Sequence, residues 1–306
     1  MKVLIASSSP VARPLITALK SSDKHEFCGL ITNPDKATGR GLQIEANELA
    51  HWAVAEKISL YKPSSIEDLK TDLLSINPDL VITVAYGKLI PQELLQLPKF
   101  GWINVHFSKL PRWWGAAPVQ WAILSGDKTS GITVFHLDKG MDTGPTYLTQ
   151  EIDINPVERS DELLDRLSVI GSDLAIKTIE LISKNTLPTP QSDDGSSLAP
   201  KFRKNDGKIN WSMPVEQIFN QYRALASNPG VWTMLGDLRL KIDGMRISYG
   251  IENLAPSSVK IESEKLFIGA TGGVIEIEKL TPSGRNQMSA AEFIRGLANR
   301  EGLSVG

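Results

Sequence analysis

Short apolar runs alternate with helical patterns along the first half of the chain. Runs typical of β-strands occupy Val3–Ala6, Phe27–Thr32, Leu80–Ala85, Trp102–His106 and Gly131–Leu137. Apolar residues with helical spacing lie between them, at Val11–Leu19, Glu48–Glu56 and Ile66–Leu74. The third run is almost wholly apolar, as in a strand buried on both faces. This alternation predicts an α/β domain built on a doubly wound, mostly parallel sheet.

The second half of the chain begins with a long helical pattern and then changes in composition. The pattern covers Asp161–Ser183, and a stretch rich in proline, glycine and serine follows it. Such a stretch is typical of a linker. After a further helical pattern at Pro214–Leu225, short β-like runs are separated by glycine turns, at Leu238–Ile242, Met245–Tyr249, Leu266–Ile268 and Val274–Leu280. Their spacing predicts a small OB-like β-barrel. We therefore predict a first domain over residues 1–189, a linker over 190–206 and a barrel domain over 207–306.

The strand ends indicate where a ligand would bind. In doubly wound sheets, ligands bind at the carboxyl ends of the strands, which here are residues 7–10, 85–89 and 106–112. The first strand is followed by Ser7-Ser8-Ser9-Pro10 and not by a glycine-rich turn. This sequence argues against a dinucleotide site and against a P-loop. A dehydrogenase is therefore a poor interpretation of the fold.

Composition excludes several other classes of protein. The hydrophobic fraction of 41%, the charged fraction of 22% and the net charge of -2 are ordinary for a globular protein. Cys28 is the single cysteine, which excludes an internal disulfide framework and a cysteine-rich zinc site. We expect no bound metal. No apolar run approaches the ~20 residues of a membrane span, and Met1–Ala6 has the character of a strand and not of a signal peptide. We expect a cytoplasmic protein without membrane contact.

The charges are distributed unevenly along the chain. Residues 201–306 hold 14 Lys and Arg against 11 Asp and Glu, although the whole chain is slightly acidic. A basic C-terminal part fits contact with an anion such as RNA. An excess this small is equally compatible with chance.

The densest group of candidate catalytic residues lies between Ile103 and Gly144. Asn104 and His106 point to the same face of their predicted strand, and Asp142 follows in a glycine-bounded turn. These groups suit direct attack by an external amine on a carbonyl. The amide and the imidazole can stabilise an oxyanion, and the imidazole and the carboxylate can transfer protons. The same residues are also compatible with a hydrogen-bonded structural pair and a turn-capping aspartate.

These residues and their spacing resemble the folate-dependent formyltransferases. The family signature is an Asn-x-His strand, a Ser-x-Leu-Pro loop and a distant Asp-x-Gly-x-Asp-Thr-Gly stretch. The chain matches it at residues 104–106, 108–111 and 138–144. The resemblance implies that Asn104, His106 and Asp142 are catalytic and that 10-formyltetrahydrofolate is the formyl donor. It also implies a folate site made by two groups of residues: Ser108, Lys109, Leu110 and Pro111, and Ala85, Tyr86, Gly87, Leu89 and Ile90.

Over nearly the whole chain, the resemblance is closest to family members that formylate the methionine of initiator Met-tRNA. Residues 33–41 are similar to their insertion loop, in which an arginine reads the acceptor end of the tRNA, and Arg40 matches that arginine. The resemblance extends tRNA contact to Lys36 on the same loop. Lys201, Arg203 and Lys204 form a basic cluster on the linker that can attract phosphates. The expected partners of this monomer are therefore initiator Met-tRNA and folate.

The sequence departs from the family in the folate loop, and other functions stay open. Phe107 stands where the family has a small residue, Lys109 where leucine is common and Trp114 where arginine is frequent. A sugar-amine formyltransferase or a formyl-folate hydrolase would share the catalytic residues, although a sugar enzyme would need no Arg40 loop. A tRNA-binding module without activity would have no reason to retain all three catalytic residues.

Overall fold

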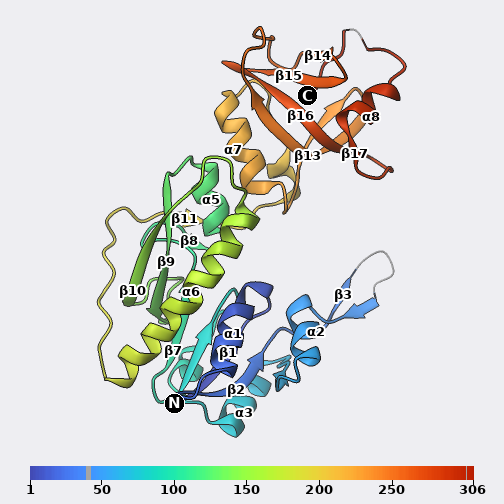
Figure 1. Ribbon diagram of the computed structural model, residues 1–306. Helices are drawn as coiled ribbons and strands as arrows, with labels where there is room; N and C mark the ends of the chain where they lie inside the picture. Colours follow the sequence, from blue (N-terminus) through green and yellow to red (C-terminus); the bar gives the residue numbers. More distant parts are fainter. Residues whose placement is uncertain (39–42, 301) are drawn as a thin grey trace. The chain divides into compact units, whose positions relative to one another are not determined.

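The computed structural model describes residues 1–38, 43–300 and 302–306, and the chain forms two compact units (Figure 1). The first unit comprises Met1–Pro118, Thr129–Asp153 and Leu164–Pro200. The second comprises Val119–Lys128, Ile154–Leu163 and Lys201–Gly306. The segment predicted as a linker contributes residues to both units. The domain boundaries expected at residues 189 and 206 stay a prediction.

A seven-stranded sheet organises the first unit, in the order β10-β9-β7-β6-β1-β2-β5. Its strands are β1 Lys2–Ala6, β2 Glu26–Ile31, β5 Leu60–Tyr61, β6 Leu80–Thr83, β7 Trp102–His106, β9 Thr129–His136 and β10 Thr146–Asp153. Neighbouring strands from β5 to β7 pair in parallel, whereas β9 pairs antiparallel with both β7 and β10. The predicted mostly parallel, doubly wound sheet is confirmed.

Helices alternate with these strands along the chain and flank the sheet (Figure 1). They are η1 Pro10–Ala12, α1 Arg13–Lys20, α2 Glu48–Ala55, α3 Ile66–Ile76, α4 Gln92–Leu95 and, from Leu164 onward, α6 Ser160–Ser183. Helix α5 Pro118–Leu124, from Val119 onward, and the first residues of α6 belong to the second unit. Side-chain caps determine where two of them begin. Asn47 accepts a hydrogen bond from the Ala50 amide at the start of α2, and Ser65 forms a capping box with Asp68 at the start of α3.

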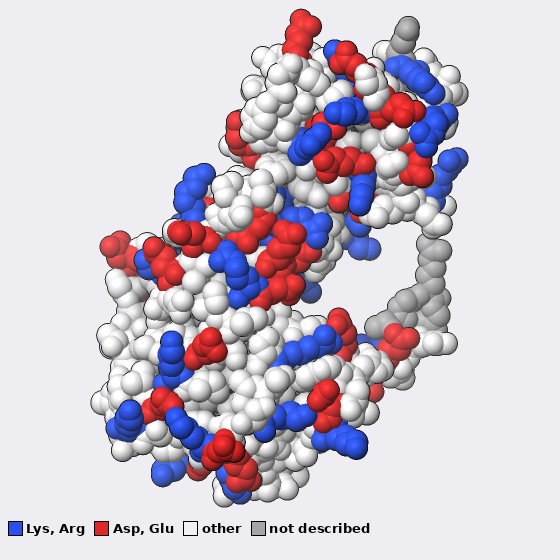
Figure 2. Space-filling view, in the orientation of Figure 1, with Lys and Arg blue, Asp and Glu red and all other residues white. Residues whose placement is uncertain are grey.

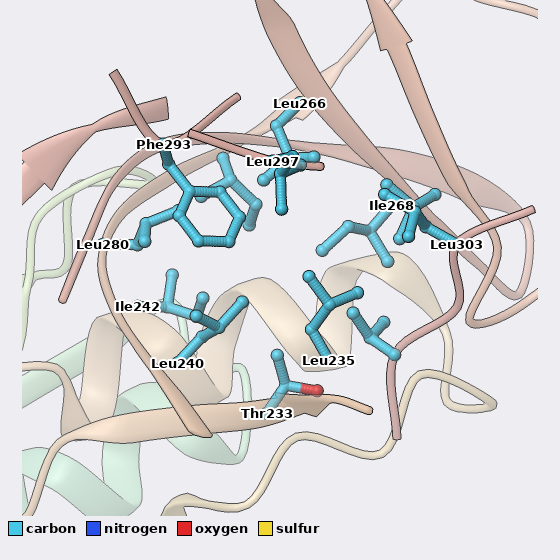
Figure 3. A pocket seen from close by; sticks show the side chains of 13 residues that line it. Thr233, Leu235, Leu240, Ile242, Leu266, Ile268, Leu280, Phe293, Leu297 and Leu303 are labelled. Carbon is cyan, nitrogen blue, oxygen red and sulfur yellow. The ribbon is translucent and has the colours of Figure 1, made fainter. Parts of the chain in front are cut away.

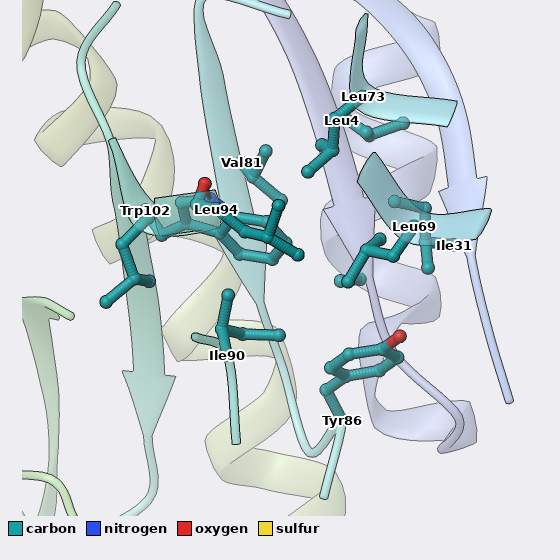
Figure 4. Packing of buried hydrophobic residues seen from close by; sticks show 11 residues of the cluster. Leu4, Ile31, Leu69, Leu73, Val81, Tyr86, Ile90, Leu94 and Trp102 are labelled. Carbon is teal, nitrogen blue, oxygen red and sulfur yellow. Dashed lines mark hydrogen bonds between the residues drawn. The ribbon is translucent and has the colours of Figure 1, made fainter. Parts of the chain in front are cut away.

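The core of the first unit holds the strand ends in place. Val81 of β6 and Trp102 of β7 are fully buried and pack with Leu73 of α3 (Figure 4). The Trp102 indole N–H donates to the main-chain oxygen of Leu94 at 2.9 Å, so even the polar atom of this side chain is satisfied. Tyr86, just after β6, belongs to the same cluster. The segment that leaves the carboxyl end of β6 is therefore anchored by the core.

The second unit is built around an antiparallel sheet in the order β12-β13-β16-β15-β14, with β17 paired to β16. Its elements are η3 Lys204–Gly207, α7 Val215–Leu225, β12 Val231–Leu235, β13 Leu238–Ser248, β14 Val259–Glu262, β15 Lys265–Ala270, β16 Gly273–Pro282, β17 Met288–Ser289 and α8 Ala290–Arg295. The C-terminal residues connect the two edges of the sheet, because Val305 pairs with Leu235 of β12 and Ser304 pairs with Ser258, directly before β14. These bridges close the sheet into the predicted small barrel.

Apolar side chains fill the barrel. Leu240, Ile242, Ile268 and Phe293 point into its interior (Figure 3), whose cavity has a volume of only about 10 Å³. A space this small cannot admit a ligand, so the interior is packed core. Within residues 1–38, 43–300 and 302–306, no helix combines the length and the apolar character needed to cross a membrane.

Several strands differ from the sequence predictions. The predicted strands Leu238–Ile242 and Met245–Tyr249 are one strand, β13, in which a bulge around Gly244 shifts the register with β16 without ending the pairing. Strands β10 and β14 lack long apolar runs, whereas β12 is short but mostly apolar, and none of the three was predicted. Neither were two short ladders, β3 Lys36–Thr38 with β4 Gln43–Glu45, and β8 Trp114–Gly115 with β11 Leu198–Ala199.

Candidate active site

Asn104 and His106 lie at the carboxyl end of β7, with their side chains on the same face. Asn104 is half-buried, and His106 is 5% exposed. The backbone of β7 is fixed on both sides, because Asn104 pairs with Thr83 of β6 and with Phe135 of β9. Both polar side chains, together with Asp142, line one cavity at the carboxyl end of the parallel strands. The structure therefore brings the three predicted catalytic residues together.

The contacts of His106 distinguish its two ring nitrogens. Nε2 lies 2.9 Å from the main-chain oxygen of Trp113. Because a carbonyl oxygen only accepts hydrogen bonds, Nε2 carries the hydrogen of this contact. Nδ1 lies 3.7 Å from Oδ2 of Asp142, and the ring makes a T-shaped contact with Phe135. The imidazole is thus oriented by its surroundings, and Nδ1 is the nitrogen that faces the carboxylate.

Asp142 reaches this position through an unusual backbone conformation. Its φ is +59°, in the left-handed region that non-glycine residues enter at a cost of roughly 1–2 kcal/mol. Its Oδ2 accepts a hydrogen bond from the Gly115 amide at 2.8 Å. Gly144, two residues on, packs so closely on β9 that a Cβ there would meet the His136 oxygen at 1.8 Å. The turn therefore depends on a glycine at its end, and it directs the Asp142 carboxylate toward both His106 and the Gly115 amide.

Thr83 determines the orientation of the Asn104 amide. Its hydroxyl, on the neighbouring strand, lies 2.8 Å from Oδ1 of Asn104 and 3.2 Å from the main-chain oxygen of Ile103. A hydroxyl has one hydrogen, and the shorter contact to Oδ1 leaves the NH₂ of Asn104 directed away from Thr83. This residue was not predicted, although a hydroxyl at the end of an apolar strand was a signal for it.

Replacing Thr83 by valine is expected to lower kcat for the reaction of this site roughly tenfold, the rate equivalent of about 1.4 kcal/mol. Valine has the shape of threonine but cannot donate to Asn104, so the amide loses its fixed orientation. Steady-state kinetics would measure the effect, with Thr83→Ser as the matched control that keeps the hydroxyl. A valine variant as active as the serine variant would remove Thr83 from this role.

The cavity that contains these groups has a volume of about 410 Å³. Residues 85–90 form one wall, and Phe107, Leu137 and Met141 contribute further apolar surface. Tyr86 and Ile90 belong at the same time to the buried cluster of the first unit (Figure 4), so that wall is anchored by the core. Burial raises the pKa of the Tyr86 hydroxyl to about 12, which keeps it neutral. The result is a largely apolar slot with polar groups at one end, as is usual for small-molecule sites.

The mouth of the cavity carries exposed and cationic groups. Leu89 is 73% exposed, and the Lys88 ammonium donates to the Pro63 oxygen at 3.3 Å. Partial burial, and then the positive charge of Lys36, lower the pKa of Lys88. The predicted residues Ala85, Tyr86, Gly87, Leu89 and Ile90 all line this cavity. Their assignment to folate stays a prediction.

The Ser108–Pro111 loop, also predicted to hold folate, contacts other parts of the first unit. Ser108 is fully buried, and its hydroxyl donates to the Arg112 oxygen at 2.7 Å. Lys109 forms an ion pair with Glu151 on the surface. The Leu110 amide donates to the Thr133 hydroxyl at 3.1 Å. None of these four residues is among those that line the cavity, whereas Phe107 is. A folate contact of this loop stays a prediction.

A residue of the predicted linker contacts the Asp142 turn. The side-chain amide of Gln191 donates to the main-chain oxygens of Asp142 and Gly144, at 2.8 and 2.6 Å. The Trp114 indole N–H donates back to the Gln191 oxygen at 3.3 Å. No pattern in the proline- and serine-rich segment distinguishes Gln191, because its contacts lie more than 40 residues away along the chain.

The residues predicted to meet tRNA belong to two parts of the chain. Lys36 is exposed on β3, and Arg40 lies outside the described residues. Lys201, Arg203 and Lys204 are exposed in the second unit. Over the part of the chain that the structure describes, there is no cluster of three His, Cys, Asp or Glu side chains suited to a metal ion.

Comparison with known proteins matches both parts of the chain to family models. Residues 1–179 match the formyl transferase model, and residues 201–298 match the model of its C-terminal domain. A methionyl-tRNA formyltransferase from Thermodesulfovibrio yellowstonii is 39% identical over 304 residues, which cover 98% of this chain and 97% of that protein.

Two solved structures share the fold at lower identity. An N-formyltransferase from Helicobacter canadensis, in complex with folinic acid and dTDP-3-aminofucose, superimposes with a TM-score of 0.67 at 21% identity. The match covers 92% of this chain and 100% of that one. HypX from Aquifex aeolicus, in complex with tetrahydrofolic acid, has a TM-score of 0.68 at 16% identity, with 97% of this chain and 48% of HypX covered.

Proposed function

The chain belongs to the formyl transferase family, and we propose that it transfers a formyl group from 10-formyltetrahydrofolate to the methionine amine of initiator Met-tRNA. The convergence of Asn104, His106 and Asp142 on one cavity carries the reaction type. The acceptor rests on the full-length similarity to a methionyl-tRNA formyltransferase at 39% identity. Such a protein acts in translation initiation, in the cytoplasm, where charged initiator tRNA is used.

The cavity suits a folate carrier in size and in polarity. Its volume of about 410 Å³ falls in the range of ~300–1,000 Å³ that is usual for small-molecule sites. The wall formed by residues 85–90 includes two positive φ values, at Ala85 and Gly87, which turn the backbone at the cavity. A flat pterin ring needs an apolar slot with backbone hydrogen-bonding groups at its edge. The formyl group would then lie at the polar end, near Asn104.

Each catalytic side chain has a distinct task in this proposal. When the amine attacks the formyl carbon, negative charge develops on the formyl oxygen, and the Asn104 NH₂ donates to it. His106 Nδ1 and the Asp142 carboxylate take the proton that the amine loses, and the imidazolium formed adds to the stabilisation of the oxygen. The two groups are 3.7 Å apart in this structure, and catalytic contacts of this kind often shorten when the substrates bind. The carbon–nitrogen bond of the carrier then breaks, and the proton passes to the departing nitrogen.

The first test is formyl transfer from 10-formyltetrahydrofolate to charged initiator Met-tRNA. Elongator Met-tRNA and a reaction without an amine acceptor are the controls. Fast transfer selective for the initiator is the expected result. Folate turnover that does not depend on tRNA would contradict the proposal, and it would point instead to a formyl-folate hydrolase or, with an aminosugar nucleotide as acceptor, to a sugar formyltransferase.

The cluster of Lys201, Arg203 and Lys204 is proposed to contact tRNA phosphates, with Lys36 and Arg40 at the acceptor end. On the face shown in Figure 2, basic side chains of the second unit are interspersed with acidic ones and form no broad single-sign surface. A local cluster of exposed cations is therefore the better candidate for phosphate contact than the overall field of the barrel.

Replacing Lys201, Arg203 and Lys204 together by alanine is expected to weaken tRNA binding and to flatten its salt dependence. For every phosphate that the variant no longer neutralises, the slope of log affinity against log salt should fall by about one. Filter binding across a salt series would measure this slope. A control variant with alanine at Lys57, Lys177 and Lys184, which are equally exposed in the first unit, should keep the original slope. Equal slopes for both triple variants would exclude this cluster from the tRNA site.

A further inference from the structure

Gln191 is the point where the segment after α6 meets the catalytic turn. Both hydrogens of its side-chain amide are used, one on the Asp142 oxygen at 2.8 Å and one on the Gly144 oxygen at 2.6 Å. Its oxygen accepts from the Trp114 indole at 3.3 Å. Trp114 directly precedes Gly115, whose amide donates to the Asp142 carboxylate. One side chain therefore joins both loops that determine where this carboxylate lies.

The turn it contacts needs such support. Asp142 is held in the left-handed region, at φ +59°, where its own backbone preference opposes the native conformation. Thr143, within the turn, is bound on its other side by the Asp138 carboxylate at 3.0 Å. Gln191 supplies the contact from a segment distant in sequence, and it binds the main chain of the same residue whose carboxylate faces His106.

The chemistry of these contacts selects an amide. Two main-chain oxygens require two donors, and an indole N–H requires one acceptor, and a primary amide provides all three from one planar group. A carboxylate of the same size would place negative charge against two carbonyl oxygens. A thioether of the same length would leave those oxygens without partners.

Ser197, six residues after Gln191, binds the loop around Trp113. The Trp113 amide donates to the Ser197 hydroxyl at 3.0 Å, and the Trp114 amide donates to the Ser197 main-chain oxygen at 2.8 Å. The Trp113 oxygen in turn holds Nε2 of His106. Residues 191–197 thus contact the supports of both His106 and Asp142, although this segment has the composition of a linker.

We propose that Gln191 is a positioning residue that sets the Asp142 carboxylate against His106 Nδ1 by fixing the backbone of the Asp142 turn. The proposal rests on the proposed function and deepens it. It means that a residue of the predicted linker helps to determine where the catalytic Asp142 carboxylate lies. Gln191 lines no part of the cavity and acts through Asp142.

Two variants and a double-mutant cycle test this role. Gln191→Met and Gln191→Glu should each lower kcat for formyl transfer about tenfold, with KM for both substrates changed less than twofold. In an Asp142→Asn background, Gln191→Met should cause no further loss, because the carboxylate it positions is gone. The exposed Gln92 offers the control, and Gln92→Met should behave as the wild type. Unchanged kcat in both Gln191 variants, or losses that multiply in the double variant, would overturn the proposal.

A second readout does not depend on the substrate. With ¹⁵N-labelled histidine, the Nδ1 signal of His106 should shift in Gln191→Met in the direction seen for Asp142→Asn, and should stay unchanged in Gln92→Met. An unshifted signal in a folded Gln191→Met would refute the positioning role. If the wild type failed to formylate Met-tRNA, the proposed function would fall, and this spectrum would still decide whether Gln191 positions Asp142.

Discussion

Replacing His106 by alanine is expected to lower kcat for formyl transfer by about 10²- to 10⁴-fold, the usual contribution of a positioned acid–base group. The substitution removes Nδ1, which lies 3.7 Å from the Asp142 carboxylate, and it removes the ring that the Trp113 oxygen orients. The carboxylate alone then has to accept the proton of the attacking amine. Binding of Met-tRNA and of folate should change little, because the ring is 5% exposed and offers little binding surface.

Single-turnover kinetics at saturating substrates would measure this loss, and equilibrium binding of tRNA would be measured on the same samples. His51→Ala is the matched control, since His51 is exposed on α2, away from the cavity-lining residues. Near-normal turnover of the His106 variant, with tRNA binding intact, would show that the imidazole takes no part in the chemistry. A loss of tRNA binding in proportion to turnover would instead assign His106 to acceptor binding.

The buried strands could be predicted because burial on both faces requires apolar residues at nearly every position of a strand. Strands β1 and β6 are covered on both faces and are therefore nearly continuous apolar runs. β10 lies at the edge of the sheet, with alternate residues exposed, and its Thr-, Gln- and Glu-containing sequence carries no such run. In the barrel, the bulge at Gly244 interrupts the apolar pattern of β13 without interrupting the strand. Sequence pattern reports burial, and it fails where a strand is half-exposed or bulged.

The candidate site shows the same division between local and long-range information. The alternation of side chains on a strand was enough to place Asn104 and His106 on one face. The glycine-bounded turn that carries Asp142 was visible in the sequence, but a turn-capping role fitted it equally well, and the resemblance was needed to favour a catalytic one. Thr83 and Gln191 contact the site across 21 and 49 residues of chain. Contacts of that range depend on the assembled fold, and a single sequence does not indicate which distant residues will meet.

Replacing Asn104 by aspartate is expected to lower kcat by about 10²- to 10³-fold, the range observed when an oxyanion donor is removed. Aspartate has the same shape, and one of its oxygens can still accept the Thr83 hydrogen bond that is now 2.8 Å long. The other oxygen, however, would replace the NH₂ donor by a negative charge, against the charge that develops on the formyl oxygen. The loss should appear in kcat and not in KM, because the interaction forms in the transition state.

Comparison with Asn104→Ala separates the loss of a donor from repulsion. Alanine removes the donor without adding charge, so Asn104→Asp should be the slower of the two variants if the amide faces the developing oxyanion. The order also tests the orientation imposed by Thr83, because Thr83→Val should cost nothing further once Asn104 is alanine. An aspartate variant faster than the alanine variant would mean that the side chain faces a proton or a cation in the transition state. The Asn104 side chain would then act through its oxygen as a hydrogen-bond acceptor, and the formyl oxygen would need another donor.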